Sequence, residues 1–324
     1  MGYFLRRLSF YLVALLVAAT LNFIIPRAMP GDPVTMMFAN ASVQVTPERI
    51  AAMKELLGFV DGPIYIQYFS YIKNILSWEL GTSIQFYPLS VNSLLGSAFG
   101  WSLFLAGTAV VLSFSIASVL GIFAAWKRGS KYDAFVTPGT LIIQAIPQMV
   151  IAMLALFTFA IGLKWFPSGY AYTPGTIPDW TSWEFIKNVG YHAVLPLFCA
   201  TIVQLVASLT CVTTSTFSPK TISRWLKVKL SENRVVFNYA ARNALLPSVT
   251  ALSMSLGMAI GGQLIIEMIF NYPGGTVLLN AIHARDYQVL QGQLIIMTMF
   301  MLCFNLMADM LYMILDPRLR TGGK

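Results

Sequence analysis

Charged residues are scarce in this chain. Only 10% of its 324 residues are Asp, Glu, Lys or Arg, whereas 57% are hydrophobic, and the mean hydropathy is +0.69. A soluble domain carries about 25% charged residues, so this composition excludes an ordinary soluble protein. The deficit comes from uncharged runs long enough to cross a bilayer, for which about 20 apolar residues suffice. We therefore predict an all-α, polytopic membrane protein.

Residues suited to catalysis or metal binding are equally few. The chain has two histidines, His192 and His283, and neither belongs to an H-E-x-x-H pattern. Its three cysteines, Cys199, Cys211 and Cys303, all fall within apolar runs, where small packing residues are expected. We predict no catalytic residue, no metal site and no disulfide, and we interpret the histidines as polar caps.

The sequence also lacks the phosphate-binding loop G-x-x-x-x-G-K-[ST]. Without that loop the chain is not expected to hydrolyse ATP by itself. We therefore expect it to bind no cofactor, and any ATP and Mg²⁺ would be used by a partner.

The apolar residues are gathered into six runs that contain no Lys, Arg, Asp or Glu. These are Leu8–Ile25, Phe99–Trp126, Ala134–Leu163, Ala193–Thr216, Leu246–Ile266 and Tyr287–Ala308. Several exceed the minimum length and must tilt, kink or extend beyond the hydrocarbon. The first run follows two arginines but lacks an evident cleavage site, so we interpret it as an uncleaved anchor. Six membrane spans are predicted.

The distribution of positive charge predicts the orientation of these spans. If the N-terminus is cytoplasmic, 14 of the 21 Lys and Arg residues lie on the cytoplasmic side. They are Arg6, Arg7, Lys127, Arg128, Lys131, Lys220, Arg224, Lys227, Lys229, Arg234, Arg242, Arg318, Arg320 and Lys324. This bias places both termini in the cytoplasm. The net charge of +8 is explained by topology and lipid contact, so no nucleic-acid partner is expected.

The predicted spans divide the chain into two parts. Residues 1–98 would form an N-terminal transmembrane helix and an external loop, and residues 99–324 a five-helix core. Thr46-Pro47-Glu48 predicts a helix start within the external loop. A second external loop, 164–192, is rich in aromatic residues, which suit the membrane–water interface better than a docked protein.

A basic segment, 217–247, separates the fourth and fifth runs. Ser218-Pro219 predicts the start of one helix, and Ser231 can cap a second. An apolar stripe is formed by Ile222, Trp225, Leu226 and Leu230, while the cations lie largely off it. A helix of this kind suits anionic lipid and a docked protein equally well.

The third and fifth runs contain polar and small residues that suit the walls of a pore. Gln144, Pro147 and Gln148 predict a kink whose polar groups face protein or water. In the fifth run, Gly261 and Gly262 allow close helix approach, and Glu267 ends the run as a candidate gate residue. Asp309, after the sixth run, is expected to be an inter-helix partner rather than an ion site.

Short motifs recur along nearly the whole chain in a specific order. They are Pro30-Gly31-Asp32-Pro33, Leu80-Gly81-Thr82-Ser83, Arg128-Gly129-Ser130, Arg242-Asn243-Ala244-Leu245-Leu246-Pro247, Gly261-Gly262, Glu267, Phe270-Asn271-Tyr272-Pro273-Gly274-Gly275, Arg285-Asp286-Tyr287, Gln291-Gly292 and Asp316-Pro317-Arg318. Their combination resembles the permease subunits of the dipeptide, oligopeptide and nickel class of ABC importers.

The resemblance implies that segment 217–247 contains a coupling helix seated on a cytoplasmic ATPase. Leu230-Ser231-Glu232 matches the end of that helix in the family, whereas Trp225 and Lys229 stand where the family usually has Ala and Gly. We expect this contact to differ from that of the relatives. The expected ATPase-contact residues are Trp225, Lys227, Lys229, Leu230, Ser231, Glu232 and Arg242.

The function implied by the resemblance is that of a permease subunit in the cytoplasmic membrane that imports peptides, nickel or oligosaccharides. Its expected partners are a second homologous permease, ATPase subunits, an extracytoplasmic solute-binding protein and membrane lipid. Two alternatives remain open. A secondary transporter would have charged residues near the bilayer midplane and often inverted repeats, and neither is found here. A membrane anchor or sensor is the other alternative, because the coupling segment departs from the family pattern.

Overall fold

The computed structural model describes residues 2–28, 46–56, 62–126, 129–215, 252, 255, 257 and 261–315. The basic segment 217–247 lies outside the described residues. The helices, in order, are α1 (Gly2–Ala28), α3 (Pro47–Leu56), α4 (Ile64–Leu76), α5 (Val91–Trp126), α6 (Lys131–Ala145), α7 (Gln148–Ala155), the π-helix η1 (Leu156–Gly162), α8 (Trp183–Ser215), α12 (Pro273–Ala284) and α13 (Tyr287–Leu315). Residues 261–269 are also helical.

Four of the described helices are long and apolar enough to cross a membrane. The spans are Leu5–Ile25, Val91–Ala124, Trp183–Leu205 and Tyr287–Met310. They coincide with the first, second, fourth and sixth predicted runs. The third run is divided among α6, α7 and η1, and the fifth is only partly described. The prediction of an all-α membrane protein is confirmed.

Several helices begin earlier than the apolar runs that predicted them, and the difference is largest for α5 and α8. α5 starts at Val91 rather than at Phe99, and α8 starts at Trp183, inside the predicted second external loop. Hydropathy identifies the part of a helix that crosses lipid, whereas backbone hydrogen bonding continues through polar residues beyond it. The helix predicted after Thr46 is confirmed as α3, which begins at Pro47.

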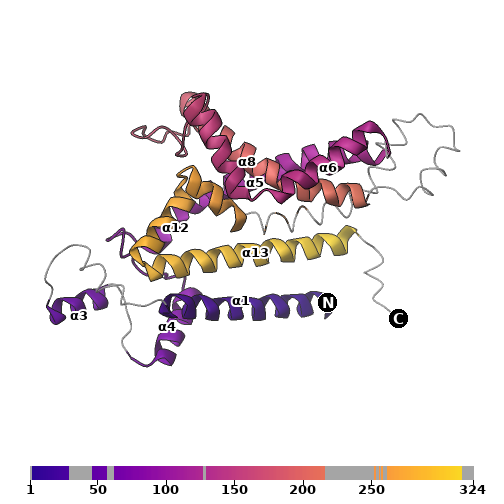
Figure 1. Ribbon diagram of the computed structural model, residues 1–324. Coiled ribbons are helices and arrows are strands. Elements are labelled where there is room, and N and C mark those ends of the chain that lie inside the picture. The colour runs from indigo at the N-terminus through magenta and orange to yellow at the C-terminus, as the bar shows by residue number, and fades with distance from the viewer. Residues whose placement is uncertain are drawn as a thin grey trace. The chain divides into compact units, whose positions relative to one another are not determined.

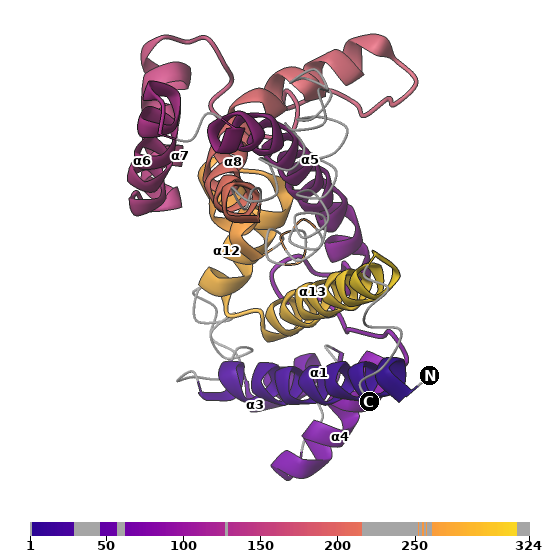
Figure 2. The ribbon, with the colours of Figure 1, turned by 90° about the vertical axis from the view of Figure 1, so that its right-hand side faces the viewer.

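The described chain divides into two compact units, and the first contains both the N-terminal helices and part of the C-terminal region. It comprises residues 1–102 and 271–302. In this unit the first half of α13 runs alongside α1, and α4 lies at the end of α1 (Figures 1 and 2). Its buried cluster joins α1, α5, α12 and α13 through Ala19, Val91, Leu95, Ala98, Val277, Ala281, Val289, Leu290, Ile295 and Ile296. The predicted division into 1–98 and 99–324 stays a prediction.

The second unit comprises residues 103–270 and 303–324. In it α6 and α7 both pack on α8. The buried positions of α5 and α8 here include small residues such as Ala109, Ala117, Cys199 and Ala200. Small side chains let helix backbones approach closely, which is how helices associate when lipid removes most of the hydrophobic driving force.

Candidate functional site

The predicted ATPase contact cannot be placed. Its residues (Trp225, Lys227, Lys229, Leu230, Ser231, Glu232 and Arg242) lie outside the described part of the chain. The six pore candidates belong to described helices or to the junctions between them, although the side chain of Gln144 in α6 is not described.

The kink predicted in the third run is a complete interruption of the helix. α6 ends at Ala145, and Ile146 and Pro147 adopt extended ψ angles of 124° and 136° before α7 begins at Gln148. Proline disfavours helical geometry in the residue before it and fits the position just before a new helix. The two extended residues interrupt the helical hydrogen bonding and free backbone polar groups, which inside a membrane is tolerated only where protein or water covers them.

The interruption brings the third and fifth predicted runs into contact. Gln148 donates a hydrogen bond from Nε2 to the carbonyl oxygen of Gly262 over 3.3 Å. A Cβ atom on Gly262 would lie 3.7 Å from Gln148 Oε1, an ordinary contact distance, so this hydrogen bond does not itself require a glycine. Gln148 and Gly262 therefore lie together although 114 positions separate them in the sequence. Each was predicted separately as a pore candidate.

Helix 261–269 carries two buried polar side chains one turn apart. Gln263 is 1% exposed and Glu267 is 0% exposed, and their spacing places them on the same helix face. Neither the amide oxygen nor the amide nitrogen of Gln263 has a hydrogen-bond partner among the described residues. A buried amide without a hydrogen bond lowers the free energy of unfolding by about 1–3 kcal/mol. An apolar side chain at this position would not carry that cost.

His192 in α8 holds the 163–182 connection rather than forming a reactive site. Its Nδ1 lies 2.9 Å from the carbonyl oxygen of Gly169 and 3.1 Å from that of Tyr170, and its Nε2 lies 3.2 Å from Thr173 Oγ1. Because a carbonyl can only accept, Nδ1 carries the proton and donates. His192 thus bonds to the connection from within α8, and its interpretation as a polar cap stays a prediction.

A buried carboxylate in the first unit joins two motifs that lie about 200 residues apart. Asp286 Oδ2 accepts hydrogen bonds from Ser83 Oγ (2.6 Å), Ile84 N (2.8 Å) and Gln85 N (3.1 Å). Its Oδ1 accepts from Val289 N, as an N-cap does at the start of α13. Asp286 is fully buried, and these four bonds compensate for the loss of water around the charge.

Two glycines of the same motifs have a steric role. Gly81 has φ +90°, and a Cβ there would lie 3.0 Å from the amide of Gln288. A Cβ on Gly292 would lie 2.8 Å from Val91 Cγ1, so α13 packs against α5 more closely than any larger residue permits.

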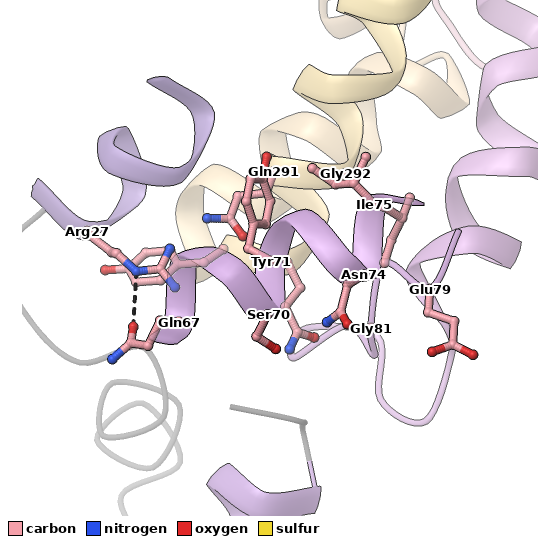
Figure 3. Close-up of a pocket in the computed structure, with 13 residues that line it drawn as sticks. Arg27, Gln67, Ser70, Tyr71, Asn74, Ile75, Glu79, Gly81, Gln291 and Gly292 are labelled. Atoms are coloured by element: carbon pink, nitrogen blue, oxygen red, sulfur yellow. Dashed lines mark hydrogen bonds between the residues drawn. The ribbon is translucent and has the colours of Figure 1, made fainter. Parts of the chain in front are cut away.

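A pocket of about 230 Å³ lies beside these glycines, in the first unit (Figure 3). The end of α1, one face of α4, the 79–81 segment and the first turns of α13 form its walls. It is lined by Arg27, Gln67, Ser70, Tyr71, Asn74, Ile75, Glu79, Leu80, Gly81, Tyr287, Gln288, Gln291 and Gly292.

The Arg27 guanidinium is held in place at one end of this pocket. It stacks on the ring of Phe23, 3.6 Å from the ring centroid, and donates from Nε to Gln67 Oε1 and from Nη1 to the carbonyl of Phe23. Desolvation lowers the pKa of Arg27, and the nearby Tyr71 and Tyr287 oppose that shift. Desolvation also raises the pKa of Tyr71 to about 12, so its hydroxyl keeps its proton at neutral pH.

Neither the Asp286 anchor nor the pocket was predicted from the sequence. Arg27 counted only as an external cation, and the motifs around Gly81 and Asp286 served only to establish a resemblance. A possible signal was the polar face of residues 67–74 within an otherwise apolar external segment.

Comparison with known proteins gives matches over nearly the whole chain. Residues 117–321 match the family described as binding-protein-dependent transport system inner membrane component, and residues 1–99 match the N-terminal family of the same membrane components.

Individual relatives match over the same extent. The chain is 31% identical to the oligopeptide transport system permease protein AppB of Bacillus subtilis, with 98% of this chain and 99% of the relative covered. It is 29% identical to the dipeptide transport system permease protein DppB of Bacillus subtilis, with 99% of each covered. It is 28% identical to the glutathione transport system permease protein GsiC of Salmonella typhimurium, again with 99% of each covered. The chain thus belongs to the family of binding-protein-dependent transport system inner membrane components.

Proposed function

We propose that this chain is the permease subunit of an ATP-driven importer that carries peptides across the cytoplasmic membrane. The observation that supports this most directly is the match, end to end, to permeases named for oligopeptides, dipeptides and glutathione. All three names describe peptides, so peptides are favoured over nickel and oligosaccharides.

The proposed assembly contains two permeases, two cytoplasmic ATPases and an external solute-binding protein. The Lys and Arg bias supports an orientation with both termini in the cytoplasm, and with the C-terminal end of α1 and the start of α13 on the opposite side. ATP hydrolysis belongs to the partner chain, because this chain lacks a phosphate-binding loop.

Segment 217–247 is proposed to transmit movement of the ATPases to the permease. Closure of the ATPase pair on ATP would displace the coupling helix and so shift the pore between inward and outward access. Leu230 and Glu232 are proposed as the central contacts, with Trp225 and Lys229 adapting the surface to a particular ATPase.

The break at Ile146–Pro147 and the facing 261–269 helix are proposed as part of the translocation path. Gln148 and Gly262 are already in contact, and Gln263 offers an amide without a partner among the described residues. Polar groups at membrane depth are expensive unless they face protein or a water-filled path. Glu267 lies one turn from Gln263 and is proposed as a gate residue.

Uptake by cells tests the proposed function. A host strain lacking this chain, but keeping its transport partners, should lose uptake of labelled di- and oligopeptides and recover it when the chain is supplied. Leu230→Ala and Glu232→Ala should restore little uptake while leaving the protein in the membrane, whereas Asn233→Ala in the same segment should restore uptake. Loss of labelled nickel uptake with peptide uptake intact would contradict the peptide proposal.

A further inference from the structure

The pocket beside Arg27 lies at the ends of two candidate membrane spans. The first membrane span ends at Ile25, two residues before Arg27, and the last begins at Tyr287, which also lines the pocket. Both spans therefore leave or enter the hydrocarbon at this point. The location follows from the two spans alone and does not depend on the proposed substrate or orientation.

The helix that covers the pocket is amphipathic in the sense expected at a membrane surface. The face of α4 with Gln67, Ser70 and Asn74 lines the pocket. The opposite side exposes large apolar residues to between 60% and 82%, namely Tyr65, Phe69 and Leu76. A helix on a soluble surface turns its polar face outward. α4 does the reverse, which is typical of a helix lying in the interface with its apolar side toward acyl chains.

Arg27 has hydrogen-bond donors left for a ligand. A guanidinium has five N–H groups, and the structure assigns one to Gln67 and one to the carbonyl of Phe23. Among the described residues Arg27 makes no ion pair. Stacking on Phe23 fixes the plane of the guanidinium, so its remaining N–H groups are already oriented. Coplanar N–H donors of this kind suit the oxygens of an oxyanion.

Two further polar atoms at the pocket have no protein partner. The Tyr71 hydroxyl and the Gln291 amide nitrogen are buried, and neither has a hydrogen-bond partner within the described residues. Both side chains line the same pocket as Arg27 (Figure 3). Buried donors of this kind are normally satisfied by ordered water or by a ligand.

We propose that this pocket binds the phosphate of a membrane phospholipid, with the Arg27 guanidinium, the Tyr71 hydroxyl and the Gln291 amide as donors. The acyl chains would run along the exposed apolar side of α1, where Leu21, Ile24 and Ile25 are each at least half exposed. A bound lipid would tie α4 to the ends of α1 and α13 and so stabilise the external part of the permease.

A phospholipid accounts for features that a soluble anion does not. A free phosphate or carboxylate would need only the donors, whereas the outward apolar face of α4 and the apolar surface leading to Arg27 require a lipid environment. Glu79 is exposed at the far rim and does not contact Arg27 in Figure 3. It leaves the phosphate end of the pocket positive.

Native mass spectrometry of the purified full-length protein, with whatever transport subunits accompany it, tests the proposal. After delipidation, phosphatidylglycerol or phosphatidylethanolamine is added back stepwise and retained lipid is counted. Wild-type protein should retain one lipid more tightly than Arg27→Gln, by about tenfold or more, because charge-assisted hydrogen bonds to the phosphate are lost. Gln291→Leu, which removes one neutral donor, should weaken retention less.

Lys73→Gln is the matched control, because it removes an exposed cation from α4 that does not line the pocket. It should retain lipid as the wild type does. Equal lipid retention by wild type and Arg27→Gln would overturn the proposal. If Arg27→Gln fails to assemble, Arg27→Lys replaces it in the test. This variant keeps the positive charge but loses the planar N–H donors of the guanidinium, so it should still weaken lipid retention.

A thermal-shift series separates the two sources of an oxyanion. Phosphatidylglycerol should raise the midpoint of unfolding of the wild type but not of Arg27→Gln. Diacylglycerol, with the same acyl chains and no phosphate, should not discriminate between them. If millimolar inorganic phosphate produces the full shift and no lipid is retained, the site takes a soluble oxyanion and the lipid proposal is wrong.

Discussion

Two buried polar side chains, one in each unit, differ in their hydrogen bonding. In the first unit, Asp286 accepts four hydrogen bonds and joins two distant motifs. In the second unit, Gln263 is equally buried but makes no hydrogen bond to the described residues, beside a helix broken at Pro147. A fully bonded buried charge fixes one arrangement, whereas an unbonded buried amide leaves room for another. Asp286 therefore anchors the segments around it, whereas the surroundings of Gln263 are less strictly determined.

The largest effect is expected from removing the anchor. Asp286→Ala leaves the Ser83 hydroxyl and three backbone N–H groups without their acceptor, so we expect the free energy of unfolding to fall by about 3 kcal/mol or more. Thermal unfolding of the purified protein measures this. Asp179→Ala serves as the control, because Asp179 is an exposed carboxylate that bonds to Thr181 and the Ser182 backbone within its own turn. Similar unfolding midpoints for the two variants would contradict the anchor.

Overpacking the first unit is expected to have the next largest effect. Gly292→Val places a Cβ 2.8 Å from Val91 Cγ1 and should destabilise the protein by about 1–3 kcal/mol, because α13 must move away from α5. Gly100→Ala in α5 meets open space and should be tolerated. The unfolding midpoint reports both changes, and a neutral Gly292→Val would show that the helices separate freely.

A change in the second unit should affect transport more than stability. Gln148→Ala removes one hydrogen bond to Gly262, for which we expect a loss of about 1 kcal/mol. Peptide uptake and ATPase stimulation should nevertheless change severalfold if this contact belongs to the moving path. Met149→Ala, at the exposed neighbouring position, is the control. Proportional losses of uptake and stability would favour a purely structural role.

The smallest effect concerns the protonation of Tyr71. Its pKa is about 12 in the folded protein and about 10 when unfolded, so folding favours the neutral form. The stability from this group is complete below pH 10 and is lost as the pH rises from 10 to about 12. Wild-type protein should therefore lose stability in that window more steeply than Tyr71→Phe. If the stability of both proteins falls equally with pH in that window, the Tyr71 hydroxyl is not desolvated.

Local features of the structure could be predicted where one physical rule dominates. The break at Pro147 fits proline chemistry, because proline has no backbone N–H and disfavours helical geometry in the residue before it, although α6 and α8 continue through Pro138 and Pro196. Pro47 starts α3 because proline fits the first turn of a helix. The orientation of α4 was not predicted, because its polar face turns inward to the pocket and its apolar face outward. Periodicity alone does not say which face meets protein.

The sequence by itself determined the membrane class, the main spans, the break at Pro147 and the family, because hydrophobic run length, proline geometry and ordered motifs are properties of local sequence. Only the tertiary structure decided that Asp286 meets Ser83, that Gln148 meets Gly262, and that Arg27, Tyr71 and Gln291 share a pocket. Each of these contacts joins residues from separate parts of the chain. Which of the many possible polar partners come together depends on how the helices pack.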